Sequence, residues 1–403
     1  MRIYLTRHGQ VRPAGFWRPG DSLADAFFNG DPSFPKGEPS ISQLGRGQAV
    51  LTANELIRRG FRGPIYSSPY IRTMQTAQLI AERTGSPIYP MGFLREFMFS
   101  AERGAEFRGS DIETLRGLFP NVAPDAVLPM PWWTSYKDEV APMRARVAAD
   151  LKAFLAAQPD DAEFLLIGHG ASVYGVVNGL ELAIPEGAMG YNCSLTVLDT
   201  GTGHTEVFGM GHLPFPMWSN NCHNDLYGIP DAVLQREPLR VMHLSDTRPS
   251  AYPYLREILC TVRPHVILHT GNCVLTGDPA EADLSRSLDY LYSVFRECGA
   301  SDIRIVPGPQ DDPEALRRHI PEAALLPSGS RITLAGTDFA LSSGGVVPEG
   351  AAHYYCLGGE RPVFHPQRGT VCAGNGCVQL ICPLRRRVWP VPVPVFRLNA
   401  GAL

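Results

Sequence analysis

Two strand-like segments, each leading directly into a histidine, most constrain what this chain can fold into. Residues 1–6 alternate apolar and polar side chains, the period expected of a pleated strand, and Arg7 and His8 follow with no room for a helix. Residues 164–167 form a continuous apolar run, typical of a strand buried on both faces, and His169 follows closely. Ligands bind at the carboxyl ends of strands in open α/β sheets. Arginine beside histidine there indicates a phosphate site, because a guanidinium fork matches phosphate oxygens.

The composition is that of an ordinary globular protein with more than one domain. A prior of about 150 residues per domain suggests two or three domains in 403 residues. The net charge of -4 gives no reason to expect nucleic-acid or membrane binding, and no apolar run approaches the roughly 18 residues that span a bilayer. The chain starts directly with strand and motif, so we expect no signal peptide. All nine cysteines lie at or after Cys193, which predicts reduced thiols in a cytoplasmic protein.

The pattern of strands and helices divides the chain into two α/β domains. We expect a first domain at 1–212, a linker at 213–238, where periodicity is lost, and a second domain at 239–403. The expected elements of the first domain are strands at 1–6, 64–68, 88–91 and 164–167, a hairpin over 194–208, and helices at 42–59, 69–81, 112–118, 140–156 and 170–180. The second domain shows an alternating series over 240–319, followed by short strands and turns.

Two irregular stretches are candidates for shaping a substrate. Residues 10–40 combine five prolines with several aromatic side chains, and both a lid over the site and an irregular surface insertion fit this composition. Residues 100–135 hold one expected helix, and we expect Trp132 and Trp133 to help form the walls around the substrate.

Four polar groups are expected to meet at one edge of the first domain's sheet. Arg7 and His8 follow the first strand, Arg72 falls in the first turn of the helix after the second, and His169 follows the buried strand. Two guanidinium groups and two imidazoles at neighbouring strand ends can converge on one tetrahedral anion. Glu96 follows a further short strand and is a candidate acid at the same edge.

Five segments, taken together, resemble the histidine phosphatase superfamily, with the phosphoglycerate-mutase-like fold. They are Thr6-Arg7-His8-Gly9, Ile41-Ser42-Gln43-Leu44-Gly45-Arg46-Gly47-Gln48-Ala49, Ser67-Ser68-Pro69-Tyr70-Ile71-Arg72-Thr73-Met74-Gln75-Thr76-Ala77, Leu94-Arg95-Glu96 and Gly168-His169-Gly170. They occur in the family's order over roughly the first half of the chain. The resemblance implies a three-layer α/β/α domain and a phosphohistidine intermediate.

The resemblance also implies a role for each candidate residue. His8 is the expected nucleophile, kept neutral by the neighbouring charges of Arg7 and Arg72. Both arginines and His169 are expected to bind the phosphoryl oxygens, and we expect His169 to be a catalytic residue as well. Glu96 occupies the position of the general acid. The arginines supply the positive charge, so we expect no metal and no cofactor in this domain.

The segment after the first histidine argues against one branch of the family. Mutases carry Glu-Ser/Thr-x-Trp-Asn there, whereas residues 10–14 read Gln-Val-Arg-Pro-Ala. The sequence therefore favours a metal-independent phosphomonoesterase, acting on a small phosphorylated substrate, with a phosphoprotein left open. An isomerase of the mutase type and a non-catalytic phospho-ligand-binding or regulatory protein are the alternatives.

The second domain resembles the calcineurin-like metallophosphoesterases at residues 241–248, 264–272 and 306–311. That family's metal ligands have changed at each motif: Arg248 replaces a histidine, Asn272 replaces an aspartate, and Gln310-Asp311 replaces an Asn-His pair. A dinuclear centre needs several carboxylate and imidazole ligands, and little beyond Asp246 remains. We therefore expect a metal-free pseudoenzyme domain that serves structure, homo-oligomerisation or ligand binding.

Overall fold

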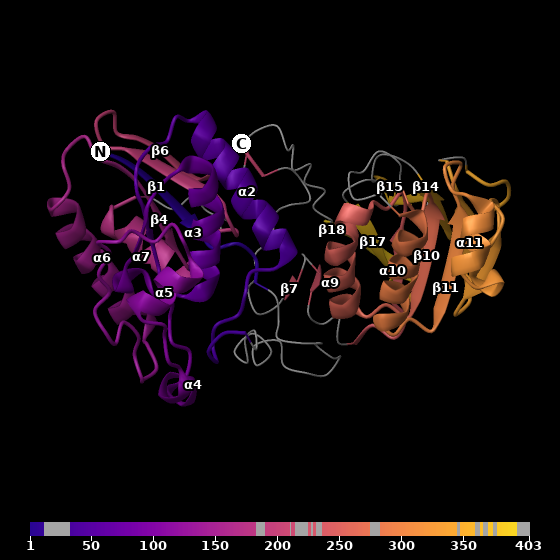
Figure 1. Ribbon diagram of the computed structural model, residues 1–403, viewed down its shortest axis with the longest axis horizontal. Helices are drawn as coiled ribbons and strands as arrows, with labels where there is room; N and C mark the ends of the chain where they lie inside the picture. Colours follow the sequence, from indigo (N-terminus) through magenta and orange to yellow (C-terminus); the bar gives the residue numbers. More distant parts are fainter. Residues whose placement is uncertain are drawn as a thin grey trace. The chain divides into compact units, whose positions relative to one another are not determined.

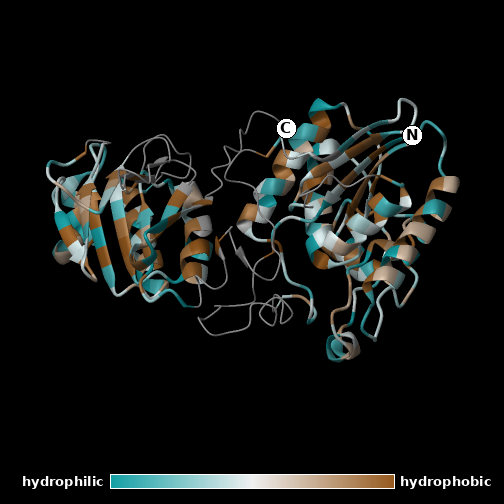
Figure 2. Cartoon of the chain, turned by 180° about the vertical axis from the view of Figure 1, so that it is seen from behind, coloured by the Kyte–Doolittle hydropathy of each residue, from teal (hydrophilic) through white to brown (hydrophobic). Residues whose placement is uncertain are grey.

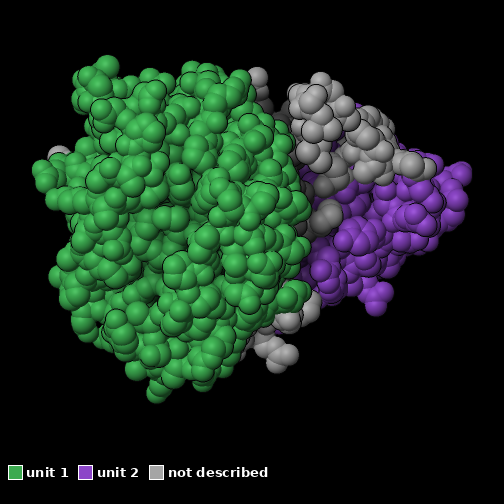
Figure 3. Space-filling model, turned by 60° about the vertical axis from the view of Figure 1, so that its left-hand side comes forward, with its two compact units in different colours: residues 1–15, 21–225, 399–403 green, residues 16–20, 226–398 purple. Residues whose placement is uncertain are grey.

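The chain divides into two compact units, residues 1–15, 21–225 and 399–403 in the first and residues 16–20 and 226–398 in the second (Figure 3). The structure is a computed structural model that describes residues 1–11, 33–182, 190–209, 211–213, 225–226, 229–230, 236–274, 283–344, 347–358, 363–365, 370–373 and 377–392. Most of the 10–40 loop and of the 213–238 linker lies outside these residues, so both stay predictions. None of the helices in the described ranges combines the length and apolar character that a membrane span requires.

A six-stranded sheet organises the first unit, in the order β3-β2-β4-β1-β5-β6. Its strands are β1 (Arg2–Arg7), β2 (Ile65–Ser67), β3 (Ile88–Pro90), β4 (Glu163–Gly168), β5 (Leu195–Asp199) and β6 (His204–Gly209). The strands β1, β2, β3 and β4 are parallel, β5 runs antiparallel to β1, and β6 runs antiparallel to β5. The carboxyl ends of β1, β2, β3 and β4 therefore share one edge, where the polar motifs follow.

Helices cover both faces of this sheet (Figure 1). They are α2 (Gln43–Arg58), α3 (Ile71–Thr84), α4 (Ala101–Glu106), α5 (Ile112–Leu118), α6 (Val140–Ala156) and α7 (Gly170–Gly179), with a 3-10 turn η1 (Gly92–Leu94). Along β4, Phe164 and Leu166 enter a core with α6 and α7, whereas Leu165 and Ile167 enter one with α2, α3 and α5. Successive strand residues point to opposite faces. This confirms that β4 is buried on both faces, as its apolar run indicates, and the three-layer α/β/α arrangement that the family resemblance implies.

The start of α2 lies directly against the segment after β1. Ser42 caps this helix, as expected, because its Oγ accepts a hydrogen bond from the amide of Gly45 at 3.0 Å. The backbones then approach so closely that a Cβ on Gly45 would lie 2.2 Å from the carbonyl oxygen of Gln10. Likewise, a Cβ on Gly9 would lie 2.5 Å from the oxygen of Gly45. Both glycines are needed for this close contact beside His8.

Two five-stranded sheets pack face to face in the second unit. Their orders are β11-β10-β9-β17-β18 and β12-β13-β14-β16-β15. The elements are β9 (Val241–Leu244), α9 (Tyr252–Val262), β10 (Val266–Gly271), α10 (Leu284–Glu297), β11 (Asp302–Pro307), α11 (Pro313–His319), β12 (Arg331–Leu334), β13 (Thr337–Ser342), β14 (Tyr354–Gly358), β15 (Val363–His365), β16 (Thr370–Ala373), β17 (Cys377–Cys382) and β18 (Arg387–Pro392). The strands β9, β10 and β11 are parallel, and Leu268 and Leu341 lie in the core between the two sheets. Figure 2 shows the hydrophobic stretches along these strands.

The smaller elements complete the described chain. They are β7 (Asp225–Leu226), β8 (Ile229–Pro230) and the 3-10 turns η2 (Pro249–Ala251), η3 (Glu322–Ala324) and η4 (Pro383–Arg385). Two local expectations were wrong. Pro69 does not open α3, because Tyr70 stays extended and the helix begins at Ile71. Residues 101–106 form α4, a helix capped by Ser100 that the sequence did not reveal.

We predict that Gly45→Ala destabilises the first unit by about 2 kcal/mol, because the added methyl group meets backbone rather than a side chain that can move. Gly117→Ala is the matched control in the exposed part of α5, where nothing lies within 4 Å of the added Cβ. It should stabilise the unit by about 0.5–1 kcal/mol through helix propensity. Urea unfolding of both variants tests this, and equal effects would contradict the close-contact argument.

Candidate active site

The imidazole of His8 is buried and held in one orientation at the end of β1. Its amide donates to the oxygen of Gly168 at 3.0 Å, and the side chain of Asn192 donates to its carbonyl oxygen at 2.8 Å. The ring atom Nδ1 lies 2.7 Å from the carbonyl oxygen of Gly9. A carbonyl only accepts hydrogen bonds, so Nδ1 carries the proton in this contact. In a neutral ring, the other nitrogen, Nε2, therefore holds a lone pair.

His169 faces His8 from the end of β4. The two ring centroids are 5.2 Å apart, in an edge-to-face arrangement. Nε2 of His169 bonds to Oγ of Ser68 at 2.8 Å, and its backbone amide donates to Oγ of Ser172 at 2.8 Å, at the start of α7. Its Nδ1 is buried and has no hydrogen-bond partner among the described residues. That atom is suited to donate to a ligand oxygen.

Two guanidinium groups place positive charge beside both imidazoles. Arg72, only 8% exposed in the first turn of α3, has its Cζ 4.4 Å from the ring centroid of Tyr70. Arg7 Nη1 donates to the oxygen of Gly190 at 3.1 Å. Burial, reinforced by Arg72 and Arg7, holds the pKa of His8 well below its usual value.

The same physical causes act on His169. Its pKa is held well below the usual value by burial, then by Arg72, with smaller contributions from His8 and Arg7. Both imidazoles are thus neutral near pH 7. The site combines two fixed positive charges with an unprotonated nitrogen, which suits an anionic electrophile such as a phosphate ester.

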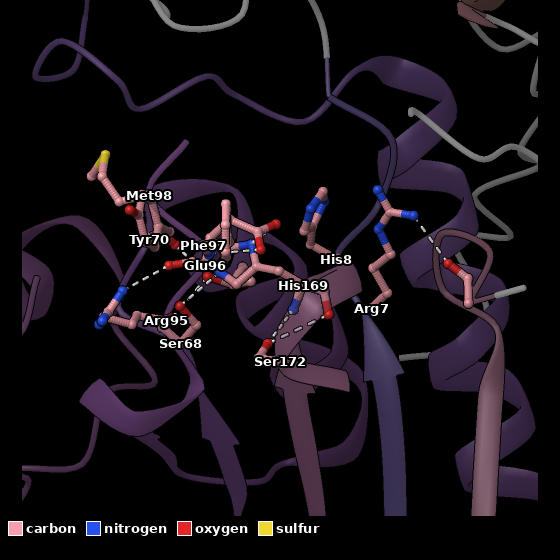
Figure 4. A network of polar contacts seen from close by, with 12 residues as sticks. Arg7, His8, Ser68, Tyr70, Arg95, Glu96, Phe97, Met98, His169 and Ser172 are labelled. Carbon is pink, nitrogen blue, oxygen red and sulfur yellow. Dashed lines mark hydrogen bonds and ion pairs between the residues drawn. The ribbon is translucent and has the colours of Figure 1, made fainter. Parts of the chain in front are cut away.

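Glu96 adds a carboxyl group to this cluster (Figure 4). Its Oε1 accepts a hydrogen bond from the amide of Phe97 at 2.8 Å, and its Oε2 lies 3.6 Å from Nδ1 of His169. Burial raises the pKa of Glu96, although Arg72 and Arg7 act in the opposite direction. A carboxyl group that retains its proton to higher pH is suited to act as an acid.

All five residues predicted from the sequence lie at the same sheet edge. Figure 4 shows Arg7, His8, Glu96 and His169 grouped above the ends of the strands, and Arg72 acts electrostatically on both histidines.

One expected wall residue is not part of this group. Trp132 is 6% exposed and donates from Nε1 to the oxygen of Ser110 at 2.9 Å, so it belongs to the core. It packs behind Tyr70, whose ring in turn contacts His169. An aromatic residue in an irregular segment gives no sequence signal for which side it faces.

Three residues that support the site were not predicted from the sequence. Ser68 contacts His169, and Asn192 contacts His8. Of the two, Ser68 lies within the segment 67–77 that resembles the family. Glu38 is buried, accepts from the amide of Ile71 at 2.9 Å, and has a pKa raised to about 8 by burial, against the opposing charge of Arg72. No local pattern marked Glu38 or Asn192, because their partners are distant in the sequence.

In the second unit, Asp246, Asn272 and Asp311, which lie in the three segments 241–248, 264–272 and 306–311, bond to one another or to nearby backbone. Asp246 Oδ1 accepts from Nδ2 of Asn272 at 2.7 Å, and Oδ1 of Asn272 accepts from the amide of Gln310 at 2.8 Å. Asp311 accepts from the amides of Cys273 and Gly308 at 2.8 and 2.9 Å. Within the described ranges, no three His, Cys, Asp or Glu side chains are grouped so that they could hold a metal ion.

Comparison with known proteins identifies the first unit. The family described as the histidine phosphatase superfamily (branch 1) matches residues 3–211, which is just over half of the chain. No curated protein matches. Among solved structures, Bacillus stearothermophilus YhfR is 17% identical, with 53% of this chain and 98% of that chain covered and a TM-score of 0.35. A mycobacterial glucosyl-3-phosphoglycerate phosphatase is 25% identical, with 49% and 88% covered and a TM-score of 0.31.

We predict that nitrogen-15 NMR of histidine-labelled protein at pH 7 shows His8 protonated on Nδ1 and unprotonated on Nε2. Burial and two neighbouring cations disfavour the imidazolium, so the spectrum should be unchanged at pH 6. His8→Asn assigns the signals by their disappearance. An imidazolium at pH 7, or a proton on Nε2, would contradict this geometry.

Proposed function

Because the chain belongs to the histidine phosphatase superfamily, we propose that it hydrolyses phosphate monoesters through a phosphohistidine formed on Nε2 of His8. The observation that carries this proposal is the contact of Nδ1 with the oxygen of Gly9, which leaves Nε2 as the nucleophilic atom. The neutral state of the ring and the two flanking arginines support it further.

In the first step, Nε2 of His8 attacks phosphorus and the bond to the leaving oxygen breaks. Arg7, Arg72 and Nδ1 of His169 bind the phosphoryl oxygens, where the transition state carries its charge. The protonated carboxyl of Glu96 transfers its proton to the leaving oxygen and becomes a carboxylate. In the second step this carboxylate takes a proton from water, whose oxygen attacks phosphorus and releases His8. The products are the alcohol and inorganic phosphate.

Hydrolysis is favoured over phosphoryl transfer to a second position of the substrate. Gln10, which stands where mutases carry a glutamate, is fully buried and accepts a hydrogen bond at its Oε1 from the N-cap Ser42 at 2.9 Å. Its side chain thus supports α2 instead of a bisphosphorylated ligand. The intact histidine and arginine cluster likewise disfavours a purely binding role. The proposed substrate is a small phosphorylated molecule in the cytoplasm.

For the second unit we propose a metal-free relative of the calcineurin-like metallophosphoesterases. The support is that Asp246, Asn272 and Asp311 direct their oxygens to partners within the protein. A metal ion would have to break these bonds as well as lose its hydration shell. The unit then contributes structure, contacts between copies of the chain, or ligand binding.

We predict that His8→Ala lowers the rate of p-nitrophenyl phosphate hydrolysis by at least about 10³-fold while the protein stays folded, because the covalent route is lost. EDTA should leave the wild-type rate unchanged. Added manganese should reveal no second activity in His8→Ala. Circular dichroism serves as the folding control. Near wild-type activity in folded His8→Ala would contradict the phosphohistidine proposal. A residual activity that depends on metal would contradict the proposal that the second unit is a metal-free relative.

We predict that Glu96→Gln slows hydrolysis of alkyl phosphates by about 10²-fold or more, because a general acid matters most for a poor leaving group. Hydrolysis of p-nitrophenyl phosphate, whose leaving oxygen needs little protonation, should change much less. Measurement of kcat/KM on both substrates tests this. Equal losses would show that Glu96 does not protonate the leaving oxygen.

A further inference from the structure

The segment that carries Glu96 belongs to neither a helix nor a strand. It follows η1 and leaves the sheet edge as an irregular run over residues 95–98. A carboxyl group in such a segment needs outside support to keep one position. The flanking residues supply it, because Arg95 and Asp138 are 5% and 6% exposed and form a two-bond ion pair, with distances of 2.5 and 3.0 Å.

Both members of this pair also bind the backbone on either side of Phe97, the residue that follows Glu96. Arg95 Nη1 donates to the carbonyl oxygen of Glu96 at 3.1 Å. Oδ2 of Asp138 accepts from the amide of Met98 at 2.9 Å, and the amide of Asp138 donates to the oxygen of Met98 at 2.9 Å. Thus the peptide groups before and after Phe97 are each tied to the pair.

These ties leave the Glu96 carboxyl little freedom. Its Oε1 accepts from the amide of Phe97, which belongs to the peptide group bound by Arg95, and its Oε2 lies 3.6 Å from Nδ1 of His169. Rotation of the 96–98 backbone would break the ion-pair contacts and the Phe97 bond together. The position of Oε2 is therefore set by side chains that do not touch the histidines themselves.

The chemistry of a buried ion pair argues against a role in stability alone. Removing two charges from water is costly, and such pairs can often be replaced by apolar side chains without loss of stability. Here both members direct further hydrogen bonds to the same short segment. The bidentate geometry adds directional precision that an apolar contact lacks.

We propose that Arg95 and Asp138 are positioning residues for Glu96, holding its carboxyl where it delivers a proton to the leaving oxygen. This inference rests on the proposed function and deepens it, because it adds a structural basis for the acid step. The reaction is unchanged: the proton of Glu96 moves to the leaving oxygen as the bond to phosphorus breaks. The Arg95–Asp138 pair sets only the position of the Glu96 carboxyl relative to the leaving oxygen.

The test compares substrates that differ in their leaving group, in variants of the whole chain. In Arg95→Met/Asp138→Leu both charges are removed and apolar volume is kept, so the protein should fold. Asp138→Asn keeps the shape and is measured as a second variant in case the first does not fold. Glu55→Gln is the matched control, because it weakens the partly buried Glu55–Arg59 ion pair of α2.

The double variant is expected to lose about 10²-fold in kcat/KM on ethyl phosphate, because a misplaced catalytic group commonly costs this much, but less than about tenfold on p-nitrophenyl phosphate. Asp138→Asn should show a smaller loss with the same preference, and Glu55→Gln should change neither rate. Adding Glu96→Gln to the double variant should cause little further loss, because both changes remove the same proton transfer.

Equal losses on the two substrates in a folded variant, or no loss at all, would overturn the positioning role. So would full additivity with Glu96→Gln. Failure of the proposed function looks different, since it would show as activity in His8→Ala or as an absence of any leaving-group effect in Glu96→Gln alone. The two failures are therefore distinguishable in the same set of measurements.

Discussion

The parallel pairing of β1 with β4 is the interaction on which the site depends. Thr6 pairs with Ile167 and Arg7 with Gly168, and the amide of His8 continues the ladder to the oxygen of Gly168. The two histidines thus leave adjacent strands at the same level. Apolar residues on both faces of β4 hold this register, because a shift by one residue would exchange the side chains of its two cores.

The electrostatic character of the site follows from this arrangement. Burial of two imidazoles beside Arg7 and Arg72 makes another positive charge unfavourable, so the rings stay neutral where an exposed histidine would begin to protonate. The same burial favours the protonated form of Glu96. The same buried environment therefore favours an unprotonated nitrogen on the histidine and a protonated carboxyl on Glu96.

The sequence was most informative where a function-bearing residue directly follows a strand. His8 and His169 could be placed because the pattern of apolar residues locates the strand ends. The carboxyl ends of parallel strands lie at one edge of the sheet, so the two histidines were expected to be close. It was least informative where a contact joins distant segments. Asp138 supports Glu96 from the residue before the N-cap of α6, and Glu38 bonds the first amide of α3, which helps explain why that helix starts at Ile71 instead of Pro69. Neither bond has a local signature.

The order of strands also has a consequence for how the chain reaches its folded state during synthesis. In the first unit, β1 lies near residue 1, whereas both of its sheet neighbours, β4 and β5, lie beyond residue 162. The second unit repeats this delay, since β9 pairs with β17, which begins at Cys377. Each unit therefore has a central strand that waits, with an unpaired edge, for partners that leave the ribosome much later. Such long-range pairing slows folding and lengthens the time during which a strand edge is open to aggregation, so a nascent chain of this kind gains from early protection by chaperones.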